Sequence, residues 1–91
     1  MNKLSIQGAL TLDTAQEKLR QGQAWIENLR TDGKIDLSEV TQCDSAGMAL
    51  LIAWARFAKQ QDRKIQFVHL PSQLLTIARL SNLDTVLPIA V

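Results

Sequence analysis

Residues 40–59, VTQCDSAGMALLIAWARFAK, join a short polar loop to the most apolar part of the chain. The loop, Asp44-Ser45-Ala46-Gly47, has residue types that begin helices, because an Asp or Ser oxygen accepts a hydrogen bond from a free N–H group of the first turn. In the run that follows, 46–58, Arg56 is the only charged residue. These features predict a helix over about 46–61 with an unusually wide apolar surface.

The patterns on either side predict strands and helices in alternation. Residues 4–12, LSIQGALTL, alternate as a strand does, with Gly8 as a possible bulge, and KIDLSEV (34–40) and RKIQFVHL (63–70) give two more strands. Residues 14–32 follow a helical face, and either Thr14 with Glu17 or Asp13 with Gln16 fits a capping box. A third helix follows Pro71, and the segment TVLPIAV, 85–91, reads as a short edge strand.

The predicted order is therefore β-α-β-α-β-α-β, which is an α/β fold. Strands separated by helices pair in parallel through right-handed crossovers. We expect a single domain over 1–91 with a mostly parallel or mixed four-stranded sheet and helices packed on it. Functional loops of such sheets lie at the carboxyl ends of the strands, which is where the loop at Asp44 falls.

Composition excludes several classes of protein. The 91 residues carry a net charge of +1, so no basic field argues for nucleic acid. Cys43 is the single cysteine, which excludes an intrachain disulfide and fits a reducing, cytoplasmic setting. The longest apolar run is shorter than the roughly 17 residues that cross a membrane, so we expect no membrane span.

Motifs for catalysis and cofactor binding are missing from the sequence. No phosphate-binding loop, dinucleotide fingerprint or Cys-x-x-Cys pair occurs. His69 is the single histidine and cannot build a metal site alone, so it is expected to be a hydrogen-bonded structural residue. Cys43 is expected to be a small buried residue. Ser45 lacks a base aimed at its hydroxyl, which argues against a small hydrolase. The sequence predicts a non-enzymatic protein without metal or cofactor.

The loop has two interpretations. In the first, Asp44 or Ser45 only caps the helix. In the second, the Ser45 hydroxyl is a phosphorylation switch or docking point. A phosphate there would add roughly −1.5 to −2 charges beside Asp44. Gly47 would let another backbone approach closely.

The apolar helix also has two interpretations. It either packs between the sheet and the other helices, or it leaves an apolar patch for a partner. The second interpretation predicts a partner-binding surface that includes the loop and one side of the helix: Asp44, Ser45, Ala46, Gly47, Met48, Ile52, Trp54 and Arg56.

The segment IDLSEVTQCDSAGMALL resembles the signature of STAS domains, the family named from sulfate transporters and anti-sigma factor antagonists. The matching positions are Asp36, Leu37 and Ser38 at the strand, then Asp44, Ser45 and Gly47 at the loop. The later ARLSNLDTVLPI resembles the closing helix and strand, and the similarity covers about 4–89. STAS domains usually begin with a two-stranded hairpin. Here about twelve residues precede the first helix, so the N-terminal strand is expected to be missing or abbreviated.

The resemblance implies a function by protein–protein binding, in one of two branches. In anti-sigma factor antagonists, the serine matching Ser45 is phosphorylated by the anti-sigma kinase, and the phosphate blocks binding. In the Mla-type ABC transporter, a small cytoplasmic STAS subunit binds the ATPase subunit and supports phospholipid transport that maintains outer-membrane lipid asymmetry. ALLIAWARFAKQQ and LPSQLLTIARLSNLDTVLP resemble the transporter branch more closely. The resemblance thus implies an ATPase partner, and a cytoplasmic location at the inner membrane through that complex.

Overall fold

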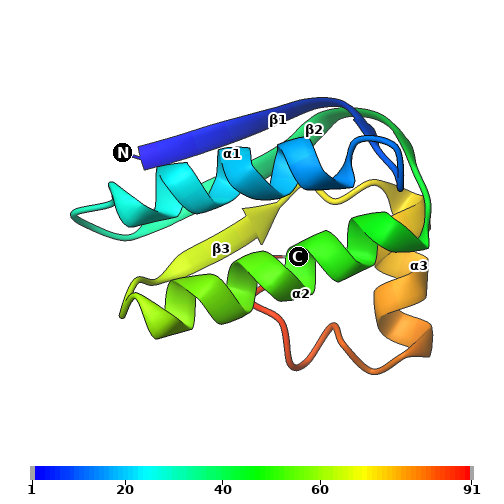
Figure 1. The fold of residues 1–91 in the computed structure, drawn as a ribbon. Coiled ribbons are helices and arrows are strands. Elements are labelled where there is room, and N and C mark those ends of the chain that lie inside the picture. The colour runs from blue at the N-terminus through cyan, green and yellow to red at the C-terminus, as the bar shows by residue number, and fades with distance from the viewer. Residues whose placement is uncertain (1, 91) are drawn as a thin grey trace.

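The computed structural model describes residues 2–90 and alternates strands with helices (Figure 1). The elements in chain order are β1 (Asn2–Leu10), α1 (Ala15–Glu27), β2 (Gly33–Cys43), α2 (Ser45–Gln60), β3 (Ile65–Val68) and α3 (Ser72–Leu80). The predicted α/β order is confirmed up to α3. Strand β2 continues to Cys43, three residues beyond the predicted 34–40, and so reaches the residue before Asp44.

The three strands form one sheet in the order β1-β2-β3, with both pairs parallel. The register places Leu4 beside Ile35 and Ile35 beside Phe67. Strand β1 carries two register shifts, and Gly8 has a φ of 81°, so the predicted bulge is confirmed. Bulges of this kind bend an edge strand and increase its twist.

The predicted fourth strand is reduced to a single bridge between Phe67 and Ile89. Phe67 N–H donates to the Pro88 carbonyl at 2.8 Å, and Ala90 N–H donates to the Phe67 carbonyl at 2.9 Å. Pro88 has no N–H group, so it cannot donate to a longer ladder. Within residues 2–90 the sheet therefore has three strands, and no strand pairs with the outer edge of β1.

Helices α1 and α2 cover one face of the sheet, and α3 stands across its end at a steep angle to α2 (Figure 1). Ile6, Ile35, Leu37 and Phe67 on the covered face are fully buried. Leu51 of α2 is fully buried with them. Because both crossovers run over the same face, the opposite face of the sheet is left without a helix.

The wide apolar surface of α2 is mostly covered within the chain, by α1, α3 and the segment 83–89. Trp54 was expected to face a partner, and this prediction is wrong. Its exposed fraction is 0%, and its Nε1 donates to the Leu19 carbonyl of α1 at 3.2 Å. The indole packs against Gly22, where α1 has no side chain to keep the helices apart. Trp54 is thus a core residue between two helices.

The capping box predicted for α1 does not form. Thr14 is the residue before the helix, but its side chain makes no cap hydrogen bond. Its hydroxyl instead donates to the Ala9 carbonyl at 2.8 Å and accepts from Thr11 N–H at 3.0 Å. Thr14 therefore fixes the turn between β1 and α1, which brings Leu12 to one end of the molecule.

Candidate partner-binding site at the start of the second helix

Asp44 joins two loops at the carboxyl ends of the strands. Its Oδ1 accepts from Ala46 N–H at 2.8 Å, which is the N-cap hydrogen bond of α2. Its Oδ2 accepts from Leu12 N–H at 3.3 Å, in the loop between β1 and α1. Its own N–H donates to the Leu10 carbonyl at 3.2 Å. One side chain therefore caps the helix and holds the neighbouring loop beside it.

Ser45 is left free of the capping role. It is the first residue of α2, its side chain is exposed, and its hydroxyl makes no hydrogen bond to residues 2–90. Of the two predicted caps, Asp44 performs the function and Ser45 does not. Because the hydroxyl has no partner in the described chain, it is accessible to a partner protein or to a kinase. It also lies where the helix dipole favours negative charge.

Gly47 and Met48 serve packing in this structure. A Cβ added at Gly47 would lie 3.2 Å from both the Leu10 carbonyl oxygen and Leu74 Cδ2. Gly47 therefore lets α2 approach the end of β1 and helix α3. Met48 is only 5% exposed. A close approach at Gly47 was predicted, but the neighbours are parts of this chain. Neither residue presents surface to a partner in this conformation, whereas Ala46 remains half-buried.

Ile52 and Arg56 lie farther along α2 and belong to another surface. Arg56 follows Ser45 by about three helical turns, or about 16 Å along the axis. Arg56 is exposed, Ile52 is half-buried, and both line a groove beside the segment 83–88. The predicted partner-binding residues thus lie in two places: Asp44, Ser45 and Ala46 at the start of the helix, and Ile52 and Arg56 beside the groove. The other three, Gly47, Met48 and Trp54, are buried.

Leu12 is the residue of this site that sequence reasoning missed. It is 78% exposed, one of three large apolar side chains exposed to this degree among residues 2–90. The sequence pattern assigned it to the end of a strand, whereas β1 ends at Leu10. The alternation continues through Leu12, so the available signal was only its position directly before the helix-start residues Asp13 and Thr14. Through Asp44 it is held beside the start of α2, so an apolar side chain accompanies the exposed Ser45 hydroxyl.

The sheet face that carries no helix holds a separate polar cluster around Asp36. Asp36 is 6% exposed, and its Oδ1 accepts from Ser38 N–H at 2.9 Å and lies 3.1 Å from His69 Nδ1. Lys3 Nζ lies 3.6 Å from Oδ2. The pKa of Asp36 is lowered to about 2, mainly by the hydrogen bond from Ser38 N–H. Burial raises this pKa, whereas the Ser38 hydroxyl and His69 lower it.

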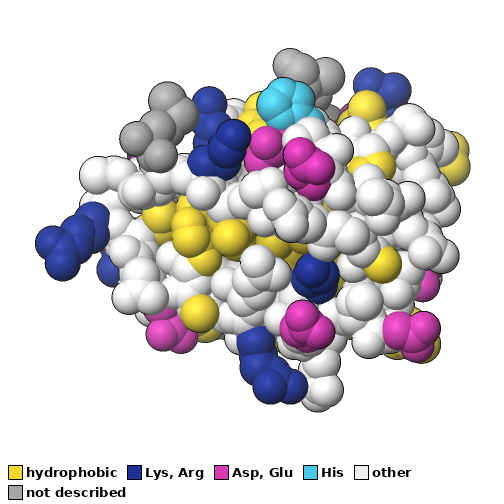
Figure 2. Space-filling view, turned by 90° about the horizontal axis from the view of Figure 1, so that it is seen from above, with side chains coloured by type: hydrophobic (Ala, Val, Ile, Leu, Met, Phe, Trp, Pro, Cys, Tyr) yellow, Lys and Arg dark blue, Asp and Glu magenta, His cyan; other side chains and the backbone are white. Residues whose placement is uncertain are grey.

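This cluster links β1, β2 and the residue after β3. Figure 2 shows the single histidine beside acidic and basic side chains. His69 has a positive φ of 57°, so its backbone adopts the left-handed conformation. The predicted structural role of His69 is confirmed by its hydrogen bond to Asp36.

Cys43 is buried, as predicted. Burial, followed by the charge of Asp44, raises the pKa of its thiol. Its Sγ lies 3.6 Å from Gln73 Oε1 of α3. A thiol whose pKa is raised is a poor nucleophile at neutral pH, so Cys43 packs the end of β2 against α3.

The geometry defines a class of protein: a small α/β domain whose exposed serine begins a buried helix at the carboxyl end of a parallel sheet, the STAS arrangement. The sequence model described as "Mlab, STAS domain" matches residues 2–88, and the chain belongs to this family. No curated protein matches the sequence significantly.

Two solved structures share the fold. One is a sulfate transporter family protein from Wolinella succinogenes, with a TM-score of 0.74 and 14% identity over 97% of this chain and 74% of that one. The other is the anti-sigma factor antagonist SpoIIAA in its unphosphorylated form, with a TM-score of 0.64 and 12% identity over 85% and 71%. At these identities the likeness establishes the fold alone.

In residues 2–90, none of the helices combines the length and apolar character that crossing a bilayer requires.

Proposed function

We propose that this protein is a non-enzymatic subunit that binds the ATPase of an Mla-type ABC transporter and supports phospholipid transport. The match to the Mlab family favours the transporter branch of the STAS domains. On this proposal the protein is cytoplasmic and reaches the inner membrane through its complex. The observation that carries the proposed contact is the exposed Ser45 hydroxyl, which Asp44 leaves free by capping α2 itself.

The proposed contact surface consists of Ser45, Leu12, Asp44 and Ala46, which we call the Ser45 surface. Leu12 supplies an exposed apolar anchor, and the unpaired hydroxyl supplies a polar group. Apolar anchors next to a few oriented polar groups are typical of protein interfaces. Because Asp44 bonds to both loops, the two parts of the surface are held in fixed relation before a partner arrives.

The test is a titration of the isolated protein against the ATPase subunit of an Mla-type transporter from the same organism, comparing the parent with Ser45→Glu. Burying an unpaired carboxylate at an interface costs several kcal/mol. The α2 dipole offsets only about 0.3–1 kcal/mol of that cost. We expect affinity to fall at least about tenfold, which corresponds to about 1.4 kcal/mol.

The control is Gln66→Glu, which adds the same charge at an exposed position of β3. It should bind the ATPase as the parent does. Ser45→Ala should bind within a few-fold of the parent and unfold at the same temperature, because Asp44 and not Ser45 caps the helix. If folded Ser45→Glu binds as tightly as the parent, the ATPase contact lies elsewhere.

The accessible hydroxyl also supports the second candidate, an anti-sigma factor antagonist regulated by phosphorylation at Ser45. A phosphate at the first residue of α2 would stand next to the Asp44 carboxylate, which already accepts two N–H bonds. Repulsion between the two groups would disturb the cap and release Leu12. Intact-mass measurement of the protein purified from its native cell separates the candidates. A phosphorylated fraction located at Ser45, together with capture of a serine kinase instead of an ATPase, would favour the antagonist.

A further inference from the structure

A groove of about 770 Å³ runs between the C-terminal half of α2 and the segment 83–88. We call it the α2 groove. Its volume lies within the range of about 300–1,000 Å³ that small-molecule sites occupy. It begins about two turns after Ser45, or about 10 Å farther along the helix axis, and Leu12, Asp44, Ser45 and Ala46 do not line it, so it is distinct from the proposed ATPase contact.

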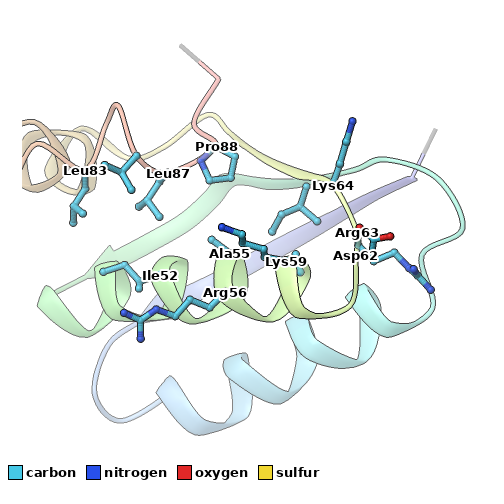
Figure 3. Close-up of a pocket in the computed structure, with 13 residues that line it drawn as sticks. Ile52, Ala55, Arg56, Lys59, Asp62, Arg63, Lys64, Leu83, Leu87 and Pro88 are labelled. Carbon is cyan, nitrogen blue, oxygen red and sulfur yellow. The ribbon is translucent and has the colours of Figure 1, made fainter.

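The floor and the segment-side wall of the groove are apolar. Ile52 and Ala55 of α2 face Leu83 and Leu87 of the segment, with Pro88 beside them (Figure 3). The backbone donors of this wall are already used: Val86 and Leu87 N–H donate to the Leu83 carbonyl at 3.1 and 2.8 Å. The helix backbone is likewise bonded within α2. The carbonyl groups of a polar main chain would therefore find these donors already taken, whereas a hydrocarbon chain needs none.

The charged residues of the groove are mostly basic. Four basic side chains line it, Arg56, Lys59, Arg63 and Lys64, against the single carboxylate of Asp62. Arg63 is engaged, since its Nε donates to the Leu29 carbonyl at 2.8 Å. Arg56, Lys59 and Lys64 are exposed and form no ion pair with residues 2–90. Three cations are thus available beside an apolar floor.

Cationic side chains border the groove along its length. Figure 3 places Ile52, Leu83 and Leu87 toward one end and Asp62, Arg63 and Lys64 toward the other, with Lys59 between them, while the Arg56 side chain extends back toward Ile52. An apolar groove bordered by unpaired cations is complementary to a molecule with a hydrocarbon tail and an anionic head. We propose that the α2 groove binds an anionic single-chain amphiphile, a fatty carboxylate or alkyl phosphate, with its tail along Leu83 and Leu87 and its head on Lys59.

The test uses ¹⁵N-labelled protein titrated with sodium dodecanoate and with dodecyl phosphate, both below their critical micelle concentrations. We expect saturable chemical-shift changes centred on Ala55, Lys59 and Leu87. Dodecyltrimethylammonium has the same tail and the opposite charge, and it should bind at least about fivefold more weakly. Circular dichroism at each end point checks that the fold persists.

Two variants test the contact of the ligand head and the contact of its tail separately. Lys59→Glu should weaken dodecanoate binding about fivefold or more, because it replaces an attraction by a repulsion. The matched control Arg20→Glu reverses an exposed charge on α1 and should have no effect. Ala55→Phe fills the floor and should abolish binding of all three amphiphiles. Lys59 is exposed and Ala55 is half-buried in the groove floor, so circular dichroism checks that each variant remains folded.

Three results would overturn the proposal: no saturable shifts with either anionic amphiphile, equal affinity for the cationic one, or shifts that map outside the groove. Two other occupants are tested in parallel. A blocked helical peptide with Leu and Glu one turn apart that shifts the groove resonances, while dodecanoate does not, would assign the groove to a protein segment. Groove resonances that shift with protein concentration alone would assign it to a second copy of the chain.

Discussion

Replacing Gly22 of α1 by Ala tests whether the two helices are packed as the structure has them. In an exposed helix this change stabilises by about 1 kcal/mol, because Gly is the poorer helix former. Here the added Cβ would lie 2.7 Å from Trp54 Cδ1 and nearer still to Nε1. The indole is fully buried and tied to the Leu19 carbonyl, so it has little room to move.

The opposing terms give a net destabilisation. Overpacking a core costs about 1–3 kcal/mol. Displacing Trp54 Nε1 from the Leu19 carbonyl costs about 0.5–1.5 kcal/mol more. Against the gain in helix propensity, Gly22→Ala should therefore destabilise the protein by about 1–3 kcal/mol. For a domain of this size, about 1 kcal/mol lowers Tm by about 4–8 °C.

The measurement is urea unfolding followed by circular dichroism, with Gln21→Ala as the control at the exposed neighbouring position. The control should stay within about 0.5 kcal/mol of the parent. In a Trp54→Leu background the clash is absent, so adding Gly22→Ala should be neutral or stabilising by up to about 1 kcal/mol. A Gly22→Ala protein that is as stable as the parent would refute the packing of Trp54 on α1.

Further changes probe the core, the polar cluster and the Ser45 surface. Trp54→Ala should cost about 3–5 kcal/mol in urea unfolding. A Tm close to that of the parent would contradict the burial of Trp54 in the core. Asp36 has a pKa of about 2 in the folded protein, below the ordinary value of 3.8, so it stabilises the fold above about pH 4. About 1–2 kcal/mol should be lost between pH 4 and 2, and Asp36→Asn should flatten that part of the stability–pH curve. Leu12→Ser should leave the Tm within a few degrees of the parent's and weaken ATPase binding at least about fivefold. Unchanged binding would show that Leu12 does not contact the ATPase. Cys43 should react with a thiol reagent only at the rate of unfolding, and fast labelling of the folded protein would contradict its burial.

The local signals in the sequence determined the order of the elements and the start of α2. The alternation of apolar residues located β1 and β3, and the polar residues at Asp44 located the start of α2 to within one residue. The combination of a strand ending Asp-Leu-Ser, the Asp-Ser-x-Gly loop and the apolar helix identified the STAS family, which the family match confirms. These features depend on hydrogen bonds and periodicities within a few residues, so they can be read without knowing what packs against what.

The tertiary structure alone decided which apolar residues are covered. Trp54 and Leu12 are both apolar residues in apolar stretches, yet one is fully buried and the other is 78% exposed. The difference arises because α1 presents Gly22 to the indole, while Thr14 and Asp44 hold the β1–α1 loop outward. The periodicity of the sequence indicates that an apolar side chain is expected to be buried. Only the packing of segments distant in the sequence determines which neighbour covers it.

The same limit applies to charge. Asp36 and His69 are far apart in the sequence and meet because β2 and β3 are adjacent and parallel. The cations of the α2 groove acquire their apolar counterpart from the segment 83–88, which folds back along α2 instead of adding a full strand. Pro88 ends the ladder after one bridge, and that backbone constraint leaves the groove open.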